Sequence, residues 1–417
     1  MGFASGSVSF RRLAVVSGET FGPSEELLDL LRNNALKVGD IGVPQEVDYG
    51  WSGGRHLFDG TFSFEHNVFS DSVLFALRID TNKAPGELKR AYEALEEEAA
   101  LAESPSGFLS KAKKKDIKDA VGRKLDEELR EGRHRRSKLV PVLWNTAGAV
   151  VYSPATGQSL EKLRELFERT FSAELLPLTA GAVALRQLET LGKRRDYEDF
   201  KPTRFVLGPE GEGQPAEYPW VAKGPEPKEF LGNEFLLWLW QESESGNGTI
   251  ELPDKTDATV MIDRSLDLDC AFGQTGRDSL RGDGPTRMPE ARDALRSGKV
   301  PRKVGLILDT SGQQFALTFG AEGFAVSSAK LPDNPDANAD TATNPRELLE
   351  VRFDQIQTLA STLDQLYGKF LKARCSSGWE AWCGNFRKWL ANSPKAGKVE
   401  VQLHTQSRRP DREPVEQ

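Results

Sequence analysis

The chain has 417 residues, of which 38% are hydrophobic, and its formal net charge is −8. This length can bury a sizeable core and predicts two or three lobes. Because no apolar run approaches the roughly 20 residues of a membrane span, and the first residues lack the order of a secretory signal, we expect a cytosolic protein that does not bind membranes.

Apolar patterns in the first part of the chain predict both strands and helices. Residues 8–16 (VSFRRLAVV) alternate as in a strand, and residues 24–33 predict a helix with a serine cap. The aromatic-rich runs 62–69 and 72–79 predict a pair of strands. From Pro85 onwards, apolar residues recur at steps of four and three, which predicts a long helix with a narrow apolar stripe.

Residues 109–138 form a basic segment in an acidic protein. The segment holds twelve Lys and Arg against six Asp and Glu, a formal charge of +6, so the rest of the chain carries −14. After a Ser-Pro-Ser-Gly break at residues 104–107, residues 111–129 predict a second helix whose apolar positions step by four. On or near the opposite arc we place Lys111, Lys114, Lys115, Lys118 and Lys124. The two helices would form a protruding, basic hairpin.

This local excess of positive charge suggests a polyanionic partner, because Lys and Arg contact nucleic acid chiefly through backbone phosphates. A solvated helical face is the alternative interpretation of such a run, and a site for an acidic partner protein is another. The candidate DNA-binding residues of the basic segment are Lys111, Lys113, Lys114, Lys115, Lys118, Arg123, Lys124, Arg133, Arg135, Arg136 and Lys138.

Further elements follow the basic segment. Residues 139–153 predict a strand hairpin that turns at 145–148, and the next segment predicts an amphipathic helix. Residues 193–228 are rich in Gly, Pro and charge and resemble an insertion loop. The apolar face of the amphipathic helix consists of Leu160, Leu163, Phe167 and Phe171.

The second half repeats the order of strands followed by a helix. A helix is predicted at 233–240 and a strand at 258–268, and then three strands at 304–308, 315–319 and 324–329. A long helix begins after Asn344, which is an N-cap followed by proline at the first helical position. Its predicted buried face is Leu349, Phe353, Ile356, Ala360, Leu363, Tyr367 and Phe370.

We therefore expect an α+β fold of antiparallel sheets with packed helices and a protruding helical hairpin. The predicted parts are an N-terminal lobe (1–84 with 139–192), a basic helical hairpin (85–138), an insertion loop (193–229), a C-terminal sheet lobe (230–331), C-terminal helices (345–400) and a disordered tail (402–417).

Residues that carry enzymatic chemistry are few. The sequence has no Walker A loop, no dinucleotide-binding glycine motif, no H-E-x-x-H and no G-x-S-x-G, and its three cysteines and four histidines lack a metal-ligand spacing. We predict no cofactor, no bound metal and no catalytic residue. The alternative is a metal-dependent DNA exonuclease with Asp263, Asp267 and Asp269 as magnesium ligands. These residues alternate with apolar ones, so we favour the solvated face of a half-buried strand.

Several motifs, taken in order along some 350 residues, resemble the recombination-associated protein RdgC family of bacterial DNA-binding proteins. They include the opening strand, Gly50-Trp51, LSKAKKKDIKDAV (109–121), the hairpin with Thr146 and Gly148, and Leu175-Leu176-Pro177-Leu178. The strongest match is residues 288–332, with an acidic helix, the Gly298-Lys299 step and the strands that follow. Lys111, Lys114, Lys118 and Arg136 fall on basic positions of the family pattern.

The resemblance implies a flattened, ring-shaped homodimer that encircles double-stranded DNA without reading its sequence, with single-stranded DNA left open as a ligand. It implies a cytoplasmic, nucleoid-associated protein that limits access of the RecA recombinase to DNA. Such a ring can hold DNA by backbone contacts alone.

The chain departs from the family pattern in three places. The usually basic approach to the acidic helix reads SLRGDGPT at 279–286, which leaves Arg281 and Arg287 as the candidate DNA-binding cations there. Where the family often has an aromatic residue before the hairpin, this chain has His134 and Ser137. The 193–228 insertion also makes it longer than typical members.

Overall fold

The computed structural model describes residues 2–37, 45–104, 107–206, 218–221, 227–244, 248–273, 276–333 and 344–392. The predicted disordered tail lies outside the described residues, and so do residues 207–217 and 222–226 of the predicted insertion loop.

An antiparallel sheet of 13 strands is the largest element of this α+β fold. Its main path follows the order β10-β9-β11-β12-β13-β1-β6-β5-β4-β2, and β3, β7 and β8 pair beside it. The strands are β1 (Val8–Val16), β2 (Val47–Ser52), β3 (Val68–Phe69), β4 (Ser72–Asn82), β5 (Arg135–Asn145), β6 (Val150–Ser153), β7 (Glu174–Pro177), β8 (Thr249–Glu251), β9 (Asp257–Cys270), β10 (Arg277–Gly282), β11 (Lys299–Thr310), β12 (Gln313–Gly320) and β13 (Ala325–Lys330).

Helices cover the sheet and extend from one end of it. They are α1 (Glu25–Asn33), α2 (Phe64–Asn67), α3 (Gly86–Ala102), α4 (Lys111–Arg130), α5 (Gln158–Phe171), α6 (Ala180–Thr190), α7 (Arg194–Asp199), α8 (Phe230–Glu244), the 3₁₀ turn η1 (Pro285–Arg287), α9 (Pro289–Arg296), α10 (Pro345–Arg374) and α11 (Trp379–Asn392). None of the helices in the described ranges has the length and apolar character that crossing a membrane requires.

Strand β1 joins the two halves of the sheet. Its first residues, Val8 and Phe10, pair with β13, while residues 11–14 pair with β6 and residues 13–16 pair with β7. The halves therefore share a strand rather than a linker, and a change in β1 acts on both.

The first half has a core of its own between the sheet and the helices α1 and α5. Trp51, Trp144 and Phe167 are fully buried in this core. Helix α1 begins after Ser24, whose side chain accepts a hydrogen bond from the backbone N–H of Leu27, as the predicted cap requires. The amphipathic face predicted for α5 is buried here through Leu163, Phe167 and Phe171.

The second half has a larger core built around α8 and α10. Helix α8 is buried on all sides from Phe230 to Trp240, and α10 begins with the predicted Asn344 cap and proline. Residues 180–190, which the sequence interpretation grouped with the N-terminal lobe, form α6 and pack in this second core. The hydroxyl of Tyr367 in α10 donates to the carbonyl of Ala180 at 3.0 Å.

One predicted strand pair is only partly correct. Within residues 62–69, a helical turn, α2, precedes the two-residue strand β3, which pairs with β4. The cause is tertiary, because the side chain of Asn67 donates to the carbonyls of Gly53 and Leu74 and accepts from the N–H of Ser63. Within residues 193–199 of the predicted insertion loop, the structure has the helix α7.

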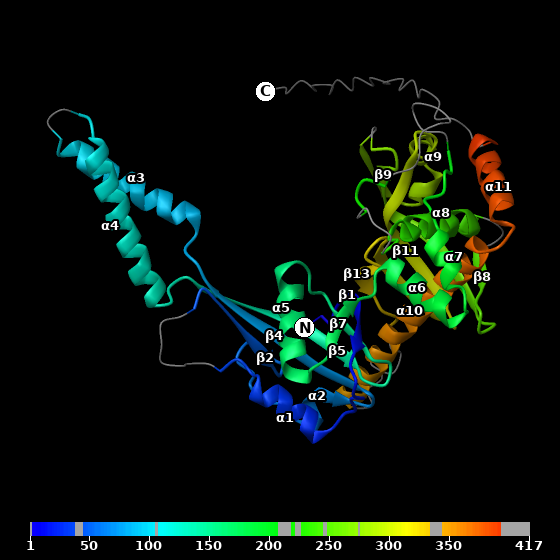
Figure 1. The fold of residues 1–417 in the computed structure, drawn as a ribbon, viewed down its shortest axis with the longest axis horizontal. Coiled ribbons are helices and arrows are strands. Elements are labelled where there is room, and N and C mark those ends of the chain that lie inside the picture. The colour runs from blue at the N-terminus through cyan, green and yellow to red at the C-terminus, as the bar shows by residue number, and fades with distance from the viewer. Residues whose placement is uncertain are drawn as a thin grey trace, which may run out of the picture.

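The protein is an open arc in Figure 1. Helices α3 and α4 project at one end, the first half forms the middle, and the second half forms the other end. Strands β4 and β5 pair along their whole lengths, from Ser72 opposite Asn145 to Asn82 opposite Arg135, and lead into the projecting helices. The sheet thus holds the basic segment away from the rest of the chain.

Candidate nucleic-acid interface

Helices α3 and α4 form a helical hairpin with a small core of its own. Ser110 caps α4 by accepting a hydrogen bond from the backbone N–H of Lys113. The buried side chains are Ile117, Val121 and Leu125 of α4, which pack against partly buried residues of and beside α3. The apolar residues at steps of four, which predicted this helix, therefore form its contact surface with α3, called the seam below.

The positively charged side chains of α4 are exposed along the hairpin. Six of the seven predicted DNA-binding residues in α4 take part in neither an ion pair nor a cation–π contact among the residues that the structure describes. They are Lys111, Lys113, Lys114, Lys115, Lys118 and Arg123. Since neither burial nor a carboxylate partner neutralises these groups, they can bind phosphate oxygens without first breaking an internal contact.

The prediction that these lysines lie on the side of α4 opposite its apolar residues is wrong in part. Lys114 and Lys118 lie three residues before the buried Ile117 and Val121, so they border the seam. Lys124 also borders it, and its ammonium lies 3.9 Å from the ring centroid of Tyr92 in α3. The outer arc is mixed in charge, because Asp116 and Arg123 share it.

Polar contacts fix the base of the hairpin. The hydroxyl of Tyr92 donates to Glu128 at 2.9 Å, and Nε2 of His134 lies 2.8 Å from the other oxygen of Glu128. The bond to His134, followed by that from Tyr92, lowers the pKa of Glu128 despite an opposing effect of burial. The side chain of Asn82 at the end of β4 donates to the carbonyl of Leu129 at 2.7 Å. His134 is thus part of the hairpin's base.

Two candidate cations near this base are occupied by carboxylates. Arg133 pairs with Glu131, and Arg135 pairs with Asp80 at 2.6 Å. Burial alone would raise the pKa of Asp80, but bonds from Arg78, Ser137 and Arg135 lower it. Because Arg78 and Asp80 are both buried, Arg135 completes a structural cluster and is the less available partner for DNA.

Arg136 and Lys138 lie on the other face of β5 from Arg135, since neighbouring residues of a strand alternate. Both are exposed and outside the ion pairs found in the described residues. Strand β6 pairs only with residues 143–145 of β5, so the preceding residues form a sheet edge in the part of the chain that is described. Cations and a proline such as Pro141 also protect an edge from pairing with another chain. Arg136 and Lys138 can therefore serve to protect this sheet edge as well as to bind DNA.

Arg281 lies in β10 and Arg287 in η1, at the opposite end of the strand order from β4 and β5, so the structure does not bring them together with α4 within one chain. Arg281 pairs with Asp267 at 2.8 Å, whereas Arg287 is exposed in η1. The predicted cations thus form two separate groups in one chain.

The three aspartates of the exonuclease alternative lie along β9 and have separate partners. Asp263 accepts a hydrogen bond from the backbone N–H of Gly284, Asp267 pairs with Arg281, and Asp269 lies within ion-pair distance of Arg277 and Arg302. The described residues contain no group of three or more His, Cys, Asp or Glu side chains placed to hold a metal ion. The carboxylates of β9 therefore stabilise the strand's solvated face.

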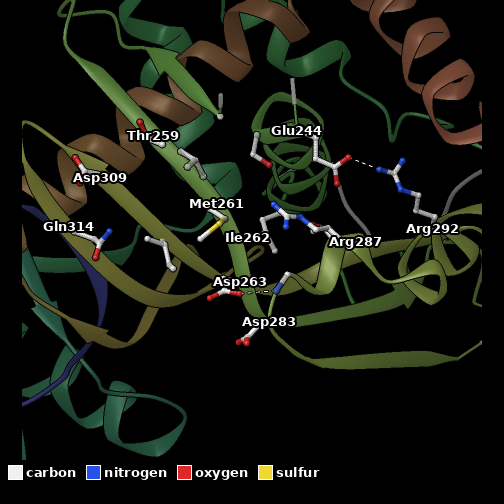
Figure 2. Close-up of a pocket in the computed structure, with 16 residues that line it drawn as sticks. Glu244, Thr259, Met261, Ile262, Asp263, Asp283, Arg287, Arg292, Asp309 and Gln314 are labelled. Carbon is white, nitrogen blue, oxygen red and sulfur yellow. Dashed lines mark hydrogen bonds and ion pairs between the residues drawn. The ribbon is translucent and has the colours of Figure 1, made fainter. Parts of the chain in front are cut away.

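Sequence reasoning missed two features of β9. Arg264 is 76% exposed and has a φ of 63°, at an irregularity where Gly305 of β11 lies against the backbone of Asp263. A cavity also opens beside Met261 (Figure 2). Both depend on the register of neighbouring strands, for which the sequence of β9 contains no signal.

The aromatic group of α11 packs, as its helical spacing indicates. Trp379 and Phe386 are buried, and the rings of Trp379 and Trp382 stack with centroids 4.7 Å apart. This group packs against the second core.

Comparison with known proteins gives no match to any protein-family model and none to any curated protein.

Proposed function

We propose that the protein binds double-stranded DNA without sequence preference, through the cations of the helical hairpin. The observation that carries the proposal is that the exposed cations of α4 have no ion-pair partner in the described residues, in a chain whose net charge is −8. Because residues 109–138 carry a formal charge of +6 and the rest of the chain carries −14, the charge distribution favours approach of the duplex to the hairpin.

The geometry supports backbone contacts over base recognition. The cations lie along one helix of an extended arm. The hairpin has only two aromatic side chains: Tyr92, which is bonded to Glu128, and Phe108, which is 83% exposed. Lysine-rich surfaces of this kind bind phosphates and release counterions, which makes the affinity fall steeply with salt.

Charge reversal of Lys114, Lys115 and Lys118 to glutamate tests the proposal. We expect weaker DNA binding and a smaller slope of log affinity against log salt concentration. If all three lysines contact phosphates, the magnitude of the slope should fall by about 2.7. The measurement is fluorescence anisotropy of a labelled duplex across a salt series. The matched control reverses Lys255, Lys372 and Lys388, three exposed lysines of the second half. An unchanged slope in the first variant would exclude these lysines as the contact.

We also propose that two copies close a ring around the duplex. The open arc supports this arrangement, as do the surfaces at its ends. At one end, Leu95 of α3 is 62% exposed and Leu101 is 39% exposed. At the other, β10 is an edge strand with a pairing partner on one side only in the described residues. Exposed apolar side chains and open strand edges are typical of surfaces that meet another chain.

Replacing Leu95 and Leu101 with arginine tests the ring at its hairpin end. We expect a dimer for the wild type by light scattering, and a loss of its preference for closed circular over linear duplex in the variant. Leu191→Arg, at another exposed leucine (51%), is the control. A wild-type monomer with equal retention on circular and linear DNA would contradict encirclement.

The resemblance to the RdgC family supports a role for this ring in the cytoplasm, at the nucleoid, where it would limit the RecA recombinase. A DNA-bound ring would occupy phosphates that a recombinase filament needs. The test is RecA-dependent strand exchange with wild type and with the lysine variant at equal concentration. If both proteins inhibited strand exchange to the same extent, inhibition of the recombinase would not depend on DNA binding by these lysines.

A further inference from the structure

A cavity of about 980 Å³ opens in the second half, beside the middle of β9. Figure 2 shows Met261 at its centre and Arg287 of η1 on one wall. Its volume is at the upper end of the roughly 300–1,000 Å³ typical of ligand-binding cavities. The proposed DNA contact through α4 does not use this cavity, so the cavity is available for another ligand.

The cavity coincides with a gap in the sheet. On the side away from β11, β9 pairs with β8 at residues 257–259, and the N–H of Val260 donates to the carbonyl just before β8. Pairing with β10 begins only at Arg264. In the described residues, positions 261–263 have no strand on that side. Because alternate residues of a strand direct their backbone groups to the same side, the N–H and C=O of Ile262 face the gap.

The gap is too short to admit a further strand. Three residues of a strand rise only about 10 Å, and β8 and β10 close the gap at its two ends. A segment that adds to a strand edge runs on past the residues that it pairs with, which these two strands prevent. The cavity therefore suits a small molecule, and the groups around it define which kind.

Acidic and apolar side chains follow one another along the cavity. Met261 of β9, which is 45% exposed, lies opposite Ile307 of β11. Asp309 of β11 lies opposite Thr259, four residues before Asp263 on β9. Residues two apart on a strand share a face, so this apolar pair separates the two aspartates, which are about 13 Å apart along the strand.

The negative charge of the cavity is only partly neutralised. Glu244 pairs with Arg292 at 2.5 Å. Asp283 and Asp309 have no ion-pair or side-chain hydrogen-bond partner in the part of the chain that is described. Four lining residues are acidic and two are basic, which leaves a formal charge of −2; they are Glu244, Asp263, Asp283 and Asp309, with Arg287 and Arg292.

Two neutral polar groups at the cavity are also without partners. Thr286 of η1 lines it and is only 7% exposed, and its hydroxyl makes no hydrogen bond within the described ranges. The C=O of Ile262 faces the gap. A buried polar group without a partner is costly, and a hydroxyl or a carbonyl can accept a hydrogen bond from an N–H. These groups therefore indicate a ligand that supplies N–H donors as well as positive charge.

We propose that this cavity binds a linear aliphatic polyamine such as spermidine. Its methylene groups cover Met261 and Ile307, and its ammonium groups lie at the carboxylates on either side of this apolar pair. An ammonium group donates three hydrogen bonds and accepts none, which matches a cavity rich in acceptors. A single metal ion cannot contact both Asp263 and Asp309, because metal–oxygen bonds are only about 2–2.6 Å long.

Calorimetric titration of the full chain with spermidine, without DNA, tests the proposal. We expect one site, and Asp283→Asn combined with Asp309→Asn should weaken it about tenfold. The matched control is Asp71→Asn combined with Glu161→Gln, at two exposed carboxylates of the first half, which should leave the affinity unchanged. Equal affinities of wild type and the cavity variant would overturn the proposal. An equal loss in the control would also overturn it, in favour of general attraction to an acidic protein.

A substitution of opposite sign guards against a loss of binding caused by misfolding. Arg287→Gln removes a positive charge from the cavity wall and should make spermidine bind severalfold more tightly. Weaker binding to this variant would contradict the proposed position of the ligand.

Two diamines of equal charge and different length test the span of the site. Diaminooctane with terminal amines should bind more tightly than the shorter putrescine, because it reaches across Met261 from one carboxylate group to the other. Asp309→Asn should remove this difference, since it deletes the carboxylate at one end. A difference that persisted in Asp309→Asn would come from apolar contact alone and would overturn the proposed arrangement, as would equal affinities of the two diamines for the wild type.

Discussion

At the scale of single residues, Asp59 shows how one carboxylate holds a loop. Its side chain accepts hydrogen bonds from the guanidinium of Arg55 at 2.8 Å and from the backbone N–H groups of Arg55 and Thr61. These bonds, that from the Arg55 side chain foremost, hold the pKa of Asp59 at about 2, against a usual value of 3.8. The neighbouring Gly53 is required there, because a Cβ would lie 2.3 Å from the carbonyl of Thr61.

This pKa predicts a specific loss of stability in acid. A pKa that is lower in the folded state stabilises the fold above pH 4, and the stabilisation disappears as the pH falls from about 4 to about 2. Asp59→Asn should therefore lower the unfolding temperature at pH 6. Between pH 4 and pH 2, the unfolding temperature of this variant should fall less than that of the wild type. Thermal unfolding at a series of pH values measures this. Asp71→Asn, at an exposed carboxylate, is the control. Parallel pH profiles for wild type and Asp59→Asn would contradict the assignment.

Which cations are available could not be predicted from the sequence. Composition alone identified the lysines of α4, but Arg133 and Arg135 have the same character in the sequence and are paired with Glu131 and Asp80. Asp80 lies 55 positions before Arg135, and their pairing depends on the register of β4 against β5. That register is a tertiary property.

At the scale of elements, the helical hairpin has a much smaller apolar core than either half of the sheet. Among its described residues, Ile117, Val121 and Leu125 form the apolar part of the buried core, and each such side chain contributes roughly 1.5–3 kcal/mol when fully buried. The rest of the protein contributes polar contacts at its base. The hairpin should consequently open on its own, at a lower free energy than global unfolding.

Val121→Asp should therefore remove the protection of the α3 and α4 amides against hydrogen exchange while leaving the thermal midpoint of the sheet within a few degrees of wild type. Burial of an unpaired carboxylate is the physical reason. Ala120→Asp, on the exposed side of the same helix, should leave protection unchanged. If Val121→Asp lowered protection in β11 as much as in α4, the hairpin and the sheet would be one cooperative unit.

The elements were predictable where local signals agree. The bounds of β1, α3, α4 and α10 follow from alternation, from steps of three and four, and from caps such as Ser110 and Asn344. The short strands β7 and β8 were not predicted, because three or four residues carry no period of their own and depend on the partner strand. Asn67 converts part of a predicted strand into α2 for a similar reason, since its hydrogen-bond partners lie in distant loops.

At the scale of the whole molecule, the two halves are joined by more than the chain. Strand β1 pairs with strands of both, and Arg12 of β1, 6% exposed, binds Asp364 of α10 through two hydrogen bonds of 2.5 and 2.6 Å. Helix α10 in turn places Phe353 against Phe69 of the first half, with ring centroids 5.1 Å apart. The predicted division into lobes therefore describes two cores on one continuous sheet.

This continuity predicts that the two halves unfold together. Phe10→Ala, at a buried position of β1, should lower the stability of β4 and of β11 by the same amount, about 3–5 kcal/mol. Denaturant unfolding followed by hydrogen exchange of peptides from each strand measures both midpoints. Two separate midpoints in the wild type would show that the halves are independent.

Strands β4 and β5 pair over eleven residues and lead into the hairpin, so the twist of these two strands sets the angle at which α3 and α4 project from the sheet. Helix α4 has 20 residues and is about 30 Å long, so a rotation of about 10° at its base displaces its far end by about 5 Å. Side chains such as Asn82 and Glu128, which lie at the pivot, thus determine the width of the opening that the arc presents, although they are far from its tip.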